Sequence, residues 1–186
     1  LARRSLTAEL SGNTKSNHLT GSNLSVGFKN RNLFRGAEQL NIHLNGGFEI
    51  QVAGQQKGYY TYRVGGDARL IFPRFLIPFN PKVTTSSAYV PKTQFSLGYE
   101  LVTKAKLYTM NSFRGSYGYI WKEDIRKTHE FNPISLLYAQ PINVTQLYKD
   151  SSISNPTLLK AIERQFIMGL TYNYTYDGQI ASNKKN

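Results

Sequence analysis

The residue types that usually carry enzyme chemistry are sparse and dispersed in this 186-residue chain. The three histidines, His18, His43 and His129, lie far apart, without the i, i+4 or HxH spacing of metal sites. Cysteine is absent, which excludes disulfides, cysteine-bound zinc and thiol nucleophiles. The 11 acidic residues form no spaced pair suited to acid–base work. We therefore expect a protein that is not an enzyme and that uses no metal or cofactor.

The chain is strongly basic, with 23 lysines and arginines and a net charge of +12. A nucleic-acid-binding surface would concentrate such cations beside exposed aromatic residues. Here they are scattered from Arg3-Arg4 to Lys184-Lys185, and no binding motif accompanies them. Dispersed cations fit contact with anionic lipid or lipopolysaccharide headgroups, and we expect no nucleic-acid partner.

Alternation of apolar and polar residues dominates the sequence. This period of two is typical of β-strands, because successive side chains point to opposite faces of a sheet. The pattern predicts eight strands, within residues 6–11, 24–29, 40–45, 60–72, 95–101, 116–121, 130–140 and 166–176. Breakers or local kinks are expected at Gly12-Asn13-Thr14, Gly46-Gly47, Gly54 and Asp177-Gly178. We predict one all-β, antiparallel domain over residues 1–186, with one short helix at 155–164 inserted in a connection.

Eight alternating strands fit either a soluble sandwich or barrel, or a transmembrane β-barrel. Two features favour the membrane barrel. The strands at 60–72 and 166–176 exceed the usual five or six residues and suffice for a tilted bilayer crossing, which needs about 9 to 11. Aromatic residues gather near strand ends, as in the girdles that flank the apolar band of such barrels.

The polar side of the alternation predicts a water-filled lumen. Its members are Lys29, Asn41, His43, Arg63, Asp67, Arg69, Glu100, Arg114 and Asn173. A closed eight-stranded barrel would have to pair these groups in a packed interior, whereas a wider barrel holds water. The pattern therefore favours a wider barrel of which this chain is one part. We expect each histidine to be solvated or to face that lumen.

Residues 29–38 carry the most specific motif, KNRNLFRGAE. This stretch resembles the first hairpin turn, N-x-N-L-F-x-G, in the barrel domain of outer-membrane assembly proteins of the BamA/TamA type, and is closest to their Bacteroidetes TamL-like branch. The matching residues are Asn30, Asn32, Leu33, Phe34 and Gly36. Weaker matches occur at 70–75, 118–121 and 130–134, so that the resemblance extends from about Arg3 to Tyr176.

The resemblance implies a 16-stranded outer-membrane barrel preceded by periplasmic domains. The chain would be its N-terminal half, without the periplasmic domains and the closing strands. The connection at 73–92 is long for a periplasmic turn, and the arginine-bearing motif of a later extracellular loop is not present. The family function is the folding and insertion of other barrel proteins, or protein translocation, in the bacterial outer membrane. The implied partners are outer-membrane lipid and lipopolysaccharide, unfolded outer-membrane proteins and accessory assembly subunits.

The first strand is the candidate functional element. A first strand that pairs weakly with the last strand of its barrel exposes backbone groups that template an incoming strand. The candidate pairing edge is Ser5, Leu6, Thr7, Ala8, Glu9, Leu10 and Ser11. Thr7 is its one β-branched residue, and Ser5 and Ala8 are short, which weakens closure. An ordinary frayed terminal strand is the alternative for this segment. A passive porin or adhesin barrel, or a soluble β-rich binding module, are the alternatives for the whole chain.

Overall fold

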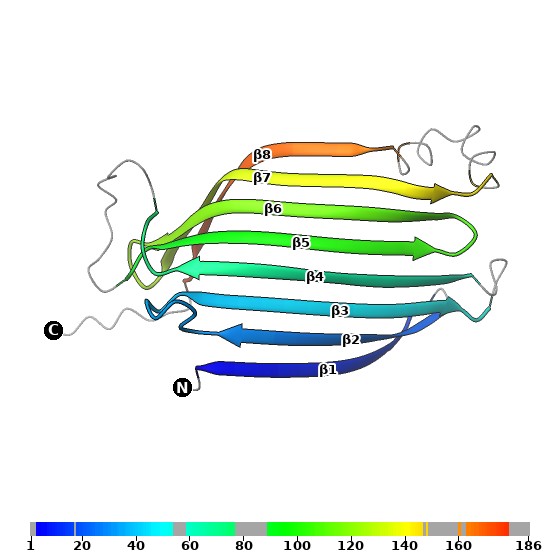
Figure 1. Cartoon of the computed structure of the whole chain (residues 1–186), viewed down its shortest axis with the longest axis horizontal. Helices are drawn as coiled ribbons and strands as arrows, with labels where there is room; N and C mark the ends of the chain where they lie inside the picture. Colours follow the sequence, from blue (N-terminus) through cyan, green and yellow to red (C-terminus); the bar gives the residue numbers. More distant parts are fainter. Residues whose placement is uncertain are drawn as a thin grey trace.

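The computed structural model describes residues 3–16, 18–53, 59–76, 89–146, 148, 160 and 163–178. Within these ranges the protein is a single sheet of antiparallel strands with almost no helix (Figure 1). The strands are β1 (Arg4–Thr14), β2 (Leu19–Asn30), β3 (Gln39–Gln51), β4 (Tyr60–Phe72), β5 (Lys92–Lys104), β6 (Tyr108–Lys122), β7 (Lys127–Val144) and β8 (Gln165–Tyr176). The all-β antiparallel prediction is confirmed.

The strands follow one another across the sheet in the order β1 to β8, so every described connection joins neighbours. β1 and β8 are the two edges and do not pair with each other, which leaves the sheet open. The β2–β3, β4–β5 and β6–β7 connections lie at one end of the sheet, on the left in Figure 1. The β1–β2, β3–β4, β5–β6 and β7–β8 connections lie at the other.

Two of the expected breakers are wrong. Gly12 pairs with Ser22 inside β1, and Gly46 pairs with Val64 inside β3. Both glycines lie in long ladders whose register continues past them, and the chain reverses only after Thr14 and Gln51. The stop at Asp177-Gly178 is confirmed, because β8 ends at Tyr176. Gly54 and most of the helix expected at 155–164 lie outside the described residues.

β7 is the longest strand, and it carries two extra residues relative to β6 and one relative to β8. The pairing of Tyr117 with Ile134 gives way to that of Tyr119 with Phe131, and a second shift occurs between Thr109 and Met110. Prolines at 133 and 141 lie at these bulges, where the ladder does not need their missing N–H. The strands bend at the first bulge, so that the left-hand parts of β6 to β8 turn away from the straighter run of β2 to β5 (Figure 1).

A buried polar network fixes this bend. Asn132 donates to Glu130 Oε1 (3.3 Å) and to Thr171 Oγ1 (3.1 Å), and Gln94 donates to Glu130 Oε1 (2.8 Å). The Asn132 amide occupies the place that a side chain on Gly118 would need. A Cβ at Gly118 would also lie 2.8 Å from the Phe131 carbonyl oxygen, which is backbone and cannot yield easily.

We predict that Gly118→Ala destabilises the sheet by about 1–3 kcal/mol, the usual range for overpacking. Gly169→Ala is the matched control, because no atom lies within 4 Å of the Cβ position at Gly169. Free energies of unfolding from urea titration of the purified protein measure the difference. Equal stability of the two variants would contradict the role assigned to Gly118.

Candidate functional site

The sheet has one apolar and one polar face. The apolar face places Leu6, Phe28, Ile42 and Ala68 side by side across β1 to β4, and the same alternation continues to β8. Exposed members of this face include Leu10, Leu24, Leu44, Val64, Leu97, Phe113, Phe166, Met168 and Leu170. In the described part of the chain, the only buried apolar side chains are Ala105, Ala139 and Tyr148.

The total solvent-accessible surface also indicates that few apolar side chains are buried. It amounts to 13,114 Å² for this 21.1-kDa chain. A folded monomer of this mass exposes about 9,000 Å². The sheet therefore lacks an internal core of its own and presents apolar side chains for something else to cover.

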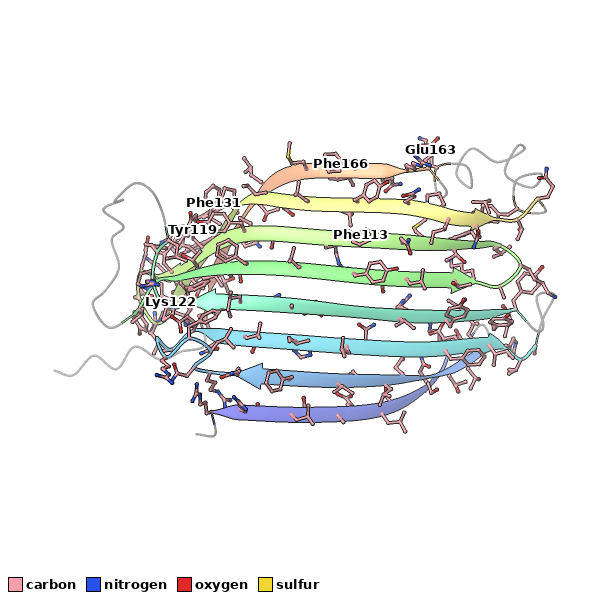
Figure 2. All side chains as sticks on the ribbon, in the orientation of Figure 1. Phe113, Tyr119, Lys122, Phe131, Glu163 and Phe166 are labelled. Carbon is pink, nitrogen blue, oxygen red and sulfur yellow. The ribbon has the colours of Figure 1, made fainter. Side chains whose placement is uncertain are left out.

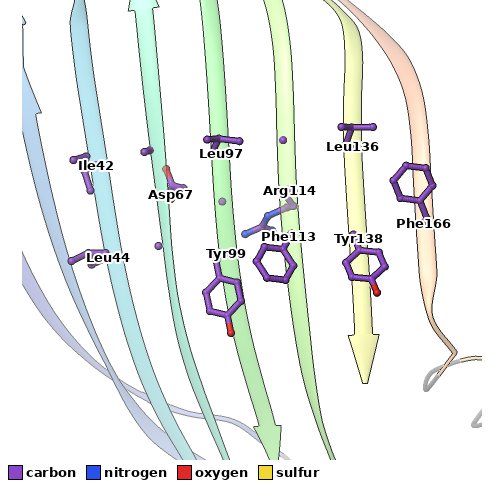
Figure 3. A pocket seen from close by; sticks show the side chains of 14 residues that line it. Ile42, Leu44, Asp67, Leu97, Tyr99, Phe113, Arg114, Leu136, Tyr138 and Phe166 are labelled. Atoms are coloured by element: carbon purple, nitrogen blue, oxygen red, sulfur yellow. The ribbon is translucent and has the colours of Figure 1, made fainter. Parts of the chain in front are cut away.

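A shallow apolar hollow of about 580 Å³ lies in the middle of this face (Figure 3). Small residues at Gly66, Ala68 and Gly115 form its floor, and leucines and aromatic rings surround it. The hydroxyls of Tyr99 and Tyr138 point the same way along the strands and donate to Asn111 Oδ1 (3.0 Å) and Gln140 Oε1 (2.9 Å).

Aromatic side chains gather at the left-hand end of the apolar face, around Tyr119 and Phe131 in Figure 2. The Trp121 and His129 rings stack with centroids 4.9 Å apart and planes at 3°, and Tyr174 lies 5.1 Å beyond His129. Phe75, from the connection after β4, packs edge-on against Tyr119 at 5.6 Å. This cluster forms a belt at one border of the apolar face.

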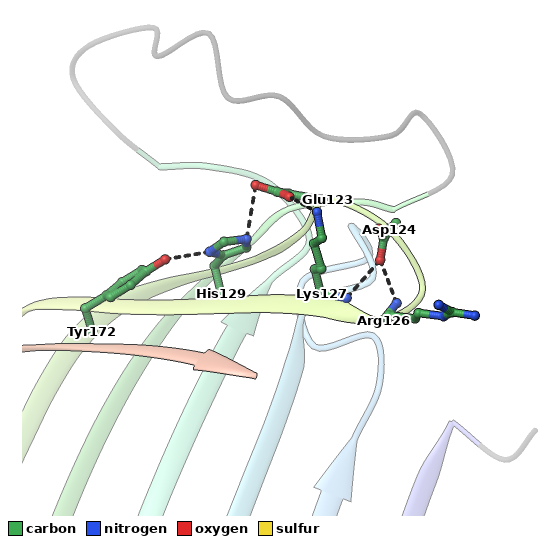
Figure 4. Close-up of polar contacts among 6 residues, drawn as sticks. All are labelled: Glu123, Asp124, Arg126, Lys127, His129 and Tyr172. Carbon is green, nitrogen blue, oxygen red and sulfur yellow. Dashed lines mark hydrogen bonds and ion pairs between the residues drawn. The ribbon is translucent and has the colours of Figure 1, made fainter. Parts of the chain in front are cut away.

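His129 is held within this belt by polar contacts (Figure 4). Its Nδ1 lies 2.7 Å from the Tyr172 hydroxyl, and its Nε2 lies 3.3 Å from a Glu123 carboxylate oxygen. His129 is only 8% exposed, so the expectation that it is solvated or faces a lumen is wrong. The bulge in β7 reverses which residues face the apolar side and places His129 between Trp121 and Tyr174. His43 and His18 are exposed, as expected.

The turn beside His129 is closed by a carboxylate. Asp124 Oδ1 accepts hydrogen bonds from the backbone N–H groups of Arg126 (2.7 Å) and Lys127 (2.9 Å). These bonds, that from Arg126 first, hold the pKa of Asp124 below its ordinary value. Glu123 forms an ion pair with Lys127 at 3.3 Å. Within the described ranges, no three histidine, aspartate or glutamate side chains gather as a metal site requires.

The polar face carries the lumen residues predicted from the sequence. Lys29, Asn41, Arg69 and Ser96 follow one another across β2 to β5, and His43 and Asp67 are neighbours in the next row. Arg63 and Glu100 form an ion pair at 3.2 Å. At the end of the sheet where β3 meets the β3–β4 connection, the Glu49 carboxylate accepts a hydrogen bond from Lys15 Nζ at 2.7 Å.

The predicted pairing edge, Ser5 to Ser11, lies in β1 and is exposed apart from the half-buried Ser5. Its register with β2 runs without a shift from Arg4 to Thr14. At the ends of this ladder, Arg31 N donates to Arg3 O (2.9 Å) and Lys15 N donates to Leu19 O (2.8 Å). Hydrogen-bonded pairs alternate along antiparallel strands, so odd-numbered residues of β1 bond to β2. The backbone groups of Leu6, Ala8 and Leu10 therefore point to the free edge.

β1 has none of the features that usually prevent strand addition, and β8 has only the register shift of its pairing with β7. Natural edges are short, bulged, or carry lysine or proline. β1 contains no proline or lysine, and Glu9 is its one charged residue after Arg4. β8 contains no charged residue in twelve positions, all of them exposed. The structure thus offers two long strand edges with unpaired backbone groups in the part of the chain it describes.

The turn motif is held by hydrogen bonds to Glu38, a residue for which the sequence analysis predicted no role. Glu38 is 6% exposed, and its carboxylate accepts from the N–H groups of Gly36 (2.9 Å) and Phe34 (3.3 Å). Asn32 accepts from Ala37 N (3.1 Å) and donates its own N–H to Asn30 Oδ1 (3.1 Å). Leu33 N donates to Glu38 O at 3.0 Å. The five motif residues therefore form one hydrogen-bonded turn, with Phe34 63% exposed at its tip.

No protein-family model, curated protein or solved structure matches this chain. None of the described helical residues belongs to a helix long and apolar enough to cross a membrane. The two faces and the free edges of the sheet are the features that bear on its function.

We predict that the turn at 31–38 loosens in acid. Backbone hydrogen bonds, first that of Glu38's own N–H, hold the pKa of Glu38 below its ordinary value of 4.5. A carboxylate with a lowered folded pKa stabilises the fold above its unfolded pKa, and that stability is lost as pH falls through the folded pKa. The protection factors of the Phe34 and Gly36 amides, which correct for the intrinsic pH dependence of exchange, should fall below about pH 4.5.

Glu38→Gln should remove most of this pH dependence, because the amide does not titrate. Glu163→Gln, at the opposite end of the sheet, is the charge-matched control. Exchange rates at Phe34 and Gly36 that keep the same pH profile in Glu38→Gln would contradict the assignment.

Proposed function

We propose that this chain is the N-terminal half of an outer-membrane β-barrel that assists the folding and insertion of other barrel proteins. The β1 edge would pair with a strand of an unfolded client and template its addition. The exposed, unbulged edge from Ser5 to Ser11 is the observation that carries this proposal. It requires neither a cofactor nor covalent chemistry.

Lipid is the proposed cover of the apolar face. From Tyr62 to Phe72, β4 runs ten residues between aromatic side chains, or about 33 Å along the strand. At a tilt of about 40° this corresponds to about 25 Å across the membrane, the height of the apolar band in such barrels. Strands of 11 to 18 residues are long enough for this crossing. The aromatic belt around Trp121 would then lie at the headgroups, beside lipopolysaccharide or phospholipid.

The wider barrel is supported by the two edges and the polar face. In hydrocarbon, unpaired backbone groups are expensive, so β1 and β8 each require a further strand. The charged polar face is too hydrophilic for a closed eight-stranded interior and suits a water-filled lumen. A 16-stranded barrel with this sheet as one half meets both requirements. Accessory assembly subunits would contact the exposed turns, such as that around Phe34.

Strand pairing at β1 also has an energetic rationale. An incoming strand satisfies the outward N–H and C=O groups of Leu6, Ala8 and Leu10, and its apolar side chains extend the lipid-facing surface. Side-chain packing along this edge is weak, because Ala8 is small and the only β-branched residues of β1 are Thr7 and Thr14. A weakly closed seam favours exchange between the barrel's own last strand and a client strand.

We predict that a cysteine in the terminal strand of a client barrel protein crosslinks to Ala8→Cys. The chain has no native cysteine, so each single variant reports one position. Ala68→Cys is the control, because it lies on the same face but in the interior strand β4. Crosslinking yield during client assembly is the measurement. Yields at Ala8 no higher than at Ala68 would exclude templating and leave a passive porin or adhesin barrel.

Replacing Ala8 with proline tests client capture without disturbing the folding of the sheet. The Ala8 N–H points to the free edge, so Ala8→Pro leaves the β1–β2 ladder intact while blocking one bond to an added strand. We expect normal accumulation of the variant with loss of client crosslinking to neighbouring Leu10→Cys. Thr7→Pro, which removes a bond to β2, should destabilise the sheet itself. Client capture that survives Ala8→Pro at the wild-type level would overturn the pairing geometry.

A further inference from the structure

A second hollow, of about 500 Å³, lies on the polar face across β4 to β7, away from the β1 edge. Its floor is formed by small residues, Ser96, Gly98, Ser116 and Ser135. Asp67, Arg69 and Arg114 are the charged side chains that line it. The hollow thus combines a small polar floor with two guanidinium groups and one carboxylate, a net charge of +1.

The two arginines in this hollow differ from the arginine next to them on the same face. Arg63 is neutralised by Glu100, at 3.2 Å. Among the described residues, no carboxylate oxygen lies within 4.0 Å of Arg69 or Arg114. Within the described ranges, neither guanidinium group is therefore held by an ion pair, although Asp67 lines the same hollow.

The floor supplies hydroxyl donors beside the arginines. Arg69, Ser96, Ser116 and Ser135 occupy one row across the sheet. Ser96 Oγ and Ser116 Oγ lie 2.6 Å apart and form a hydrogen bond that uses only one of their two protons. The second proton of this pair and the Ser135 hydroxyl can be donated into the hollow.

Gly98 gives Arg114 access to the hollow. Arg114 pairs with Gly98 across β5 and β6, and its Nε lies 3.5 Å from the place that a Cβ on Gly98 would occupy. The Arg114 side chain therefore extends over the glycine towards β4, where Asp67 pairs with the same glycine. A branched side chain at position 98 would fill the space that Arg114 now uses.

We propose that this hollow binds a phosphate group. Arginine forks and hydroxyl donors match the tetrahedral oxygens of phosphate, and bonds between charged partners are the stronger ones. The phosphate would come either from the free ion or from a phosphate ester on a larger solute in the lumen. The site does not depend on strand capture at β1, and it holds equally for an assembly barrel and for a passive one.

Calorimetric titration of the full-length protein with sodium phosphate, at constant ionic strength, tests this assignment. We expect saturable binding that weakens by about tenfold or more in Arg69→Gln and in Arg114→Gln. Arg63→Gln removes the same charge from the same face and should leave affinity unchanged. Gly98→Val, which changes no charge, should also weaken binding. Non-saturable binding, or equal losses in Arg63→Gln and Arg69→Gln, would overturn the proposal.

Glucose 6-phosphate and glucose distinguish the source of the phosphate. Tighter binding of glucose 6-phosphate than of inorganic phosphate supports an ester as the ligand, and equal or weaker binding supports the free ion. Glucose that binds as tightly as its phosphate would overturn the proposal, because the arginines would then contribute nothing.

Discussion

The structure depends on an apolar face that the sheet does not cover itself. Burial of apolar surface contributes about 25 cal/mol per Å² and is the main favourable term in folding. Here rows such as Leu6, Phe28, Ile42 and Ala68 face outwards across the strands instead of packing into a core. The unpaired N–H and C=O groups at the β1 and β8 edges likewise require hydrogen-bond partners outside the sheet. Lipid would cover the apolar face, and further strands would pair with the edges. A membrane barrel and strand capture therefore both follow from surfaces that this sheet leaves without a partner.

The polar contacts give this sheet its shape. Asn132 and its partners hold the bend at the β7 bulge, where Gly118 leaves room for the amide. Glu38 and Asp124 close two turns at the same end of the sheet by accepting backbone N–H groups. Glu38 is buried in its turn, whereas Asp124 is exposed. Most charged side chains of the strands, including Arg63 and Glu100, lie on the opposite face, and Arg4 and Lys127, at strand ends, do not.

The alternation of residue types predicted all eight strands, and for Tyr60–Phe72 it also predicted both ends. Other strands extend further than predicted, because glycines, asparagines and threonines at their ends continue the ladder without an apolar signal. The phase change at the β7 bulge could not be predicted, since one extra residue reverses the faces and places His129 among aromatic rings. The role of Glu38 depends on a turn conformation that composition does not reveal. The free edge follows from the order of the strands in the sheet, which the alternation of residue types does not predict.

Site-directed spin labelling along β4, in the full-length protein reconstituted in lipid, tests whether the apolar face of the sheet contacts lipid. Single cysteines would be placed in turn at each position from 63 to 70, and the label's exposure to oxygen, which enters lipid, and to a water-soluble nickel complex would be measured. A sheet whose apolar face contacts lipid should give a period of two, with oxygen favoured at Val64, Gly66, Ala68 and Leu70 and nickel favoured at Arg63, Gly65, Asp67 and Arg69. Equal access of the nickel complex to both sets of positions would contradict a lipid-facing sheet.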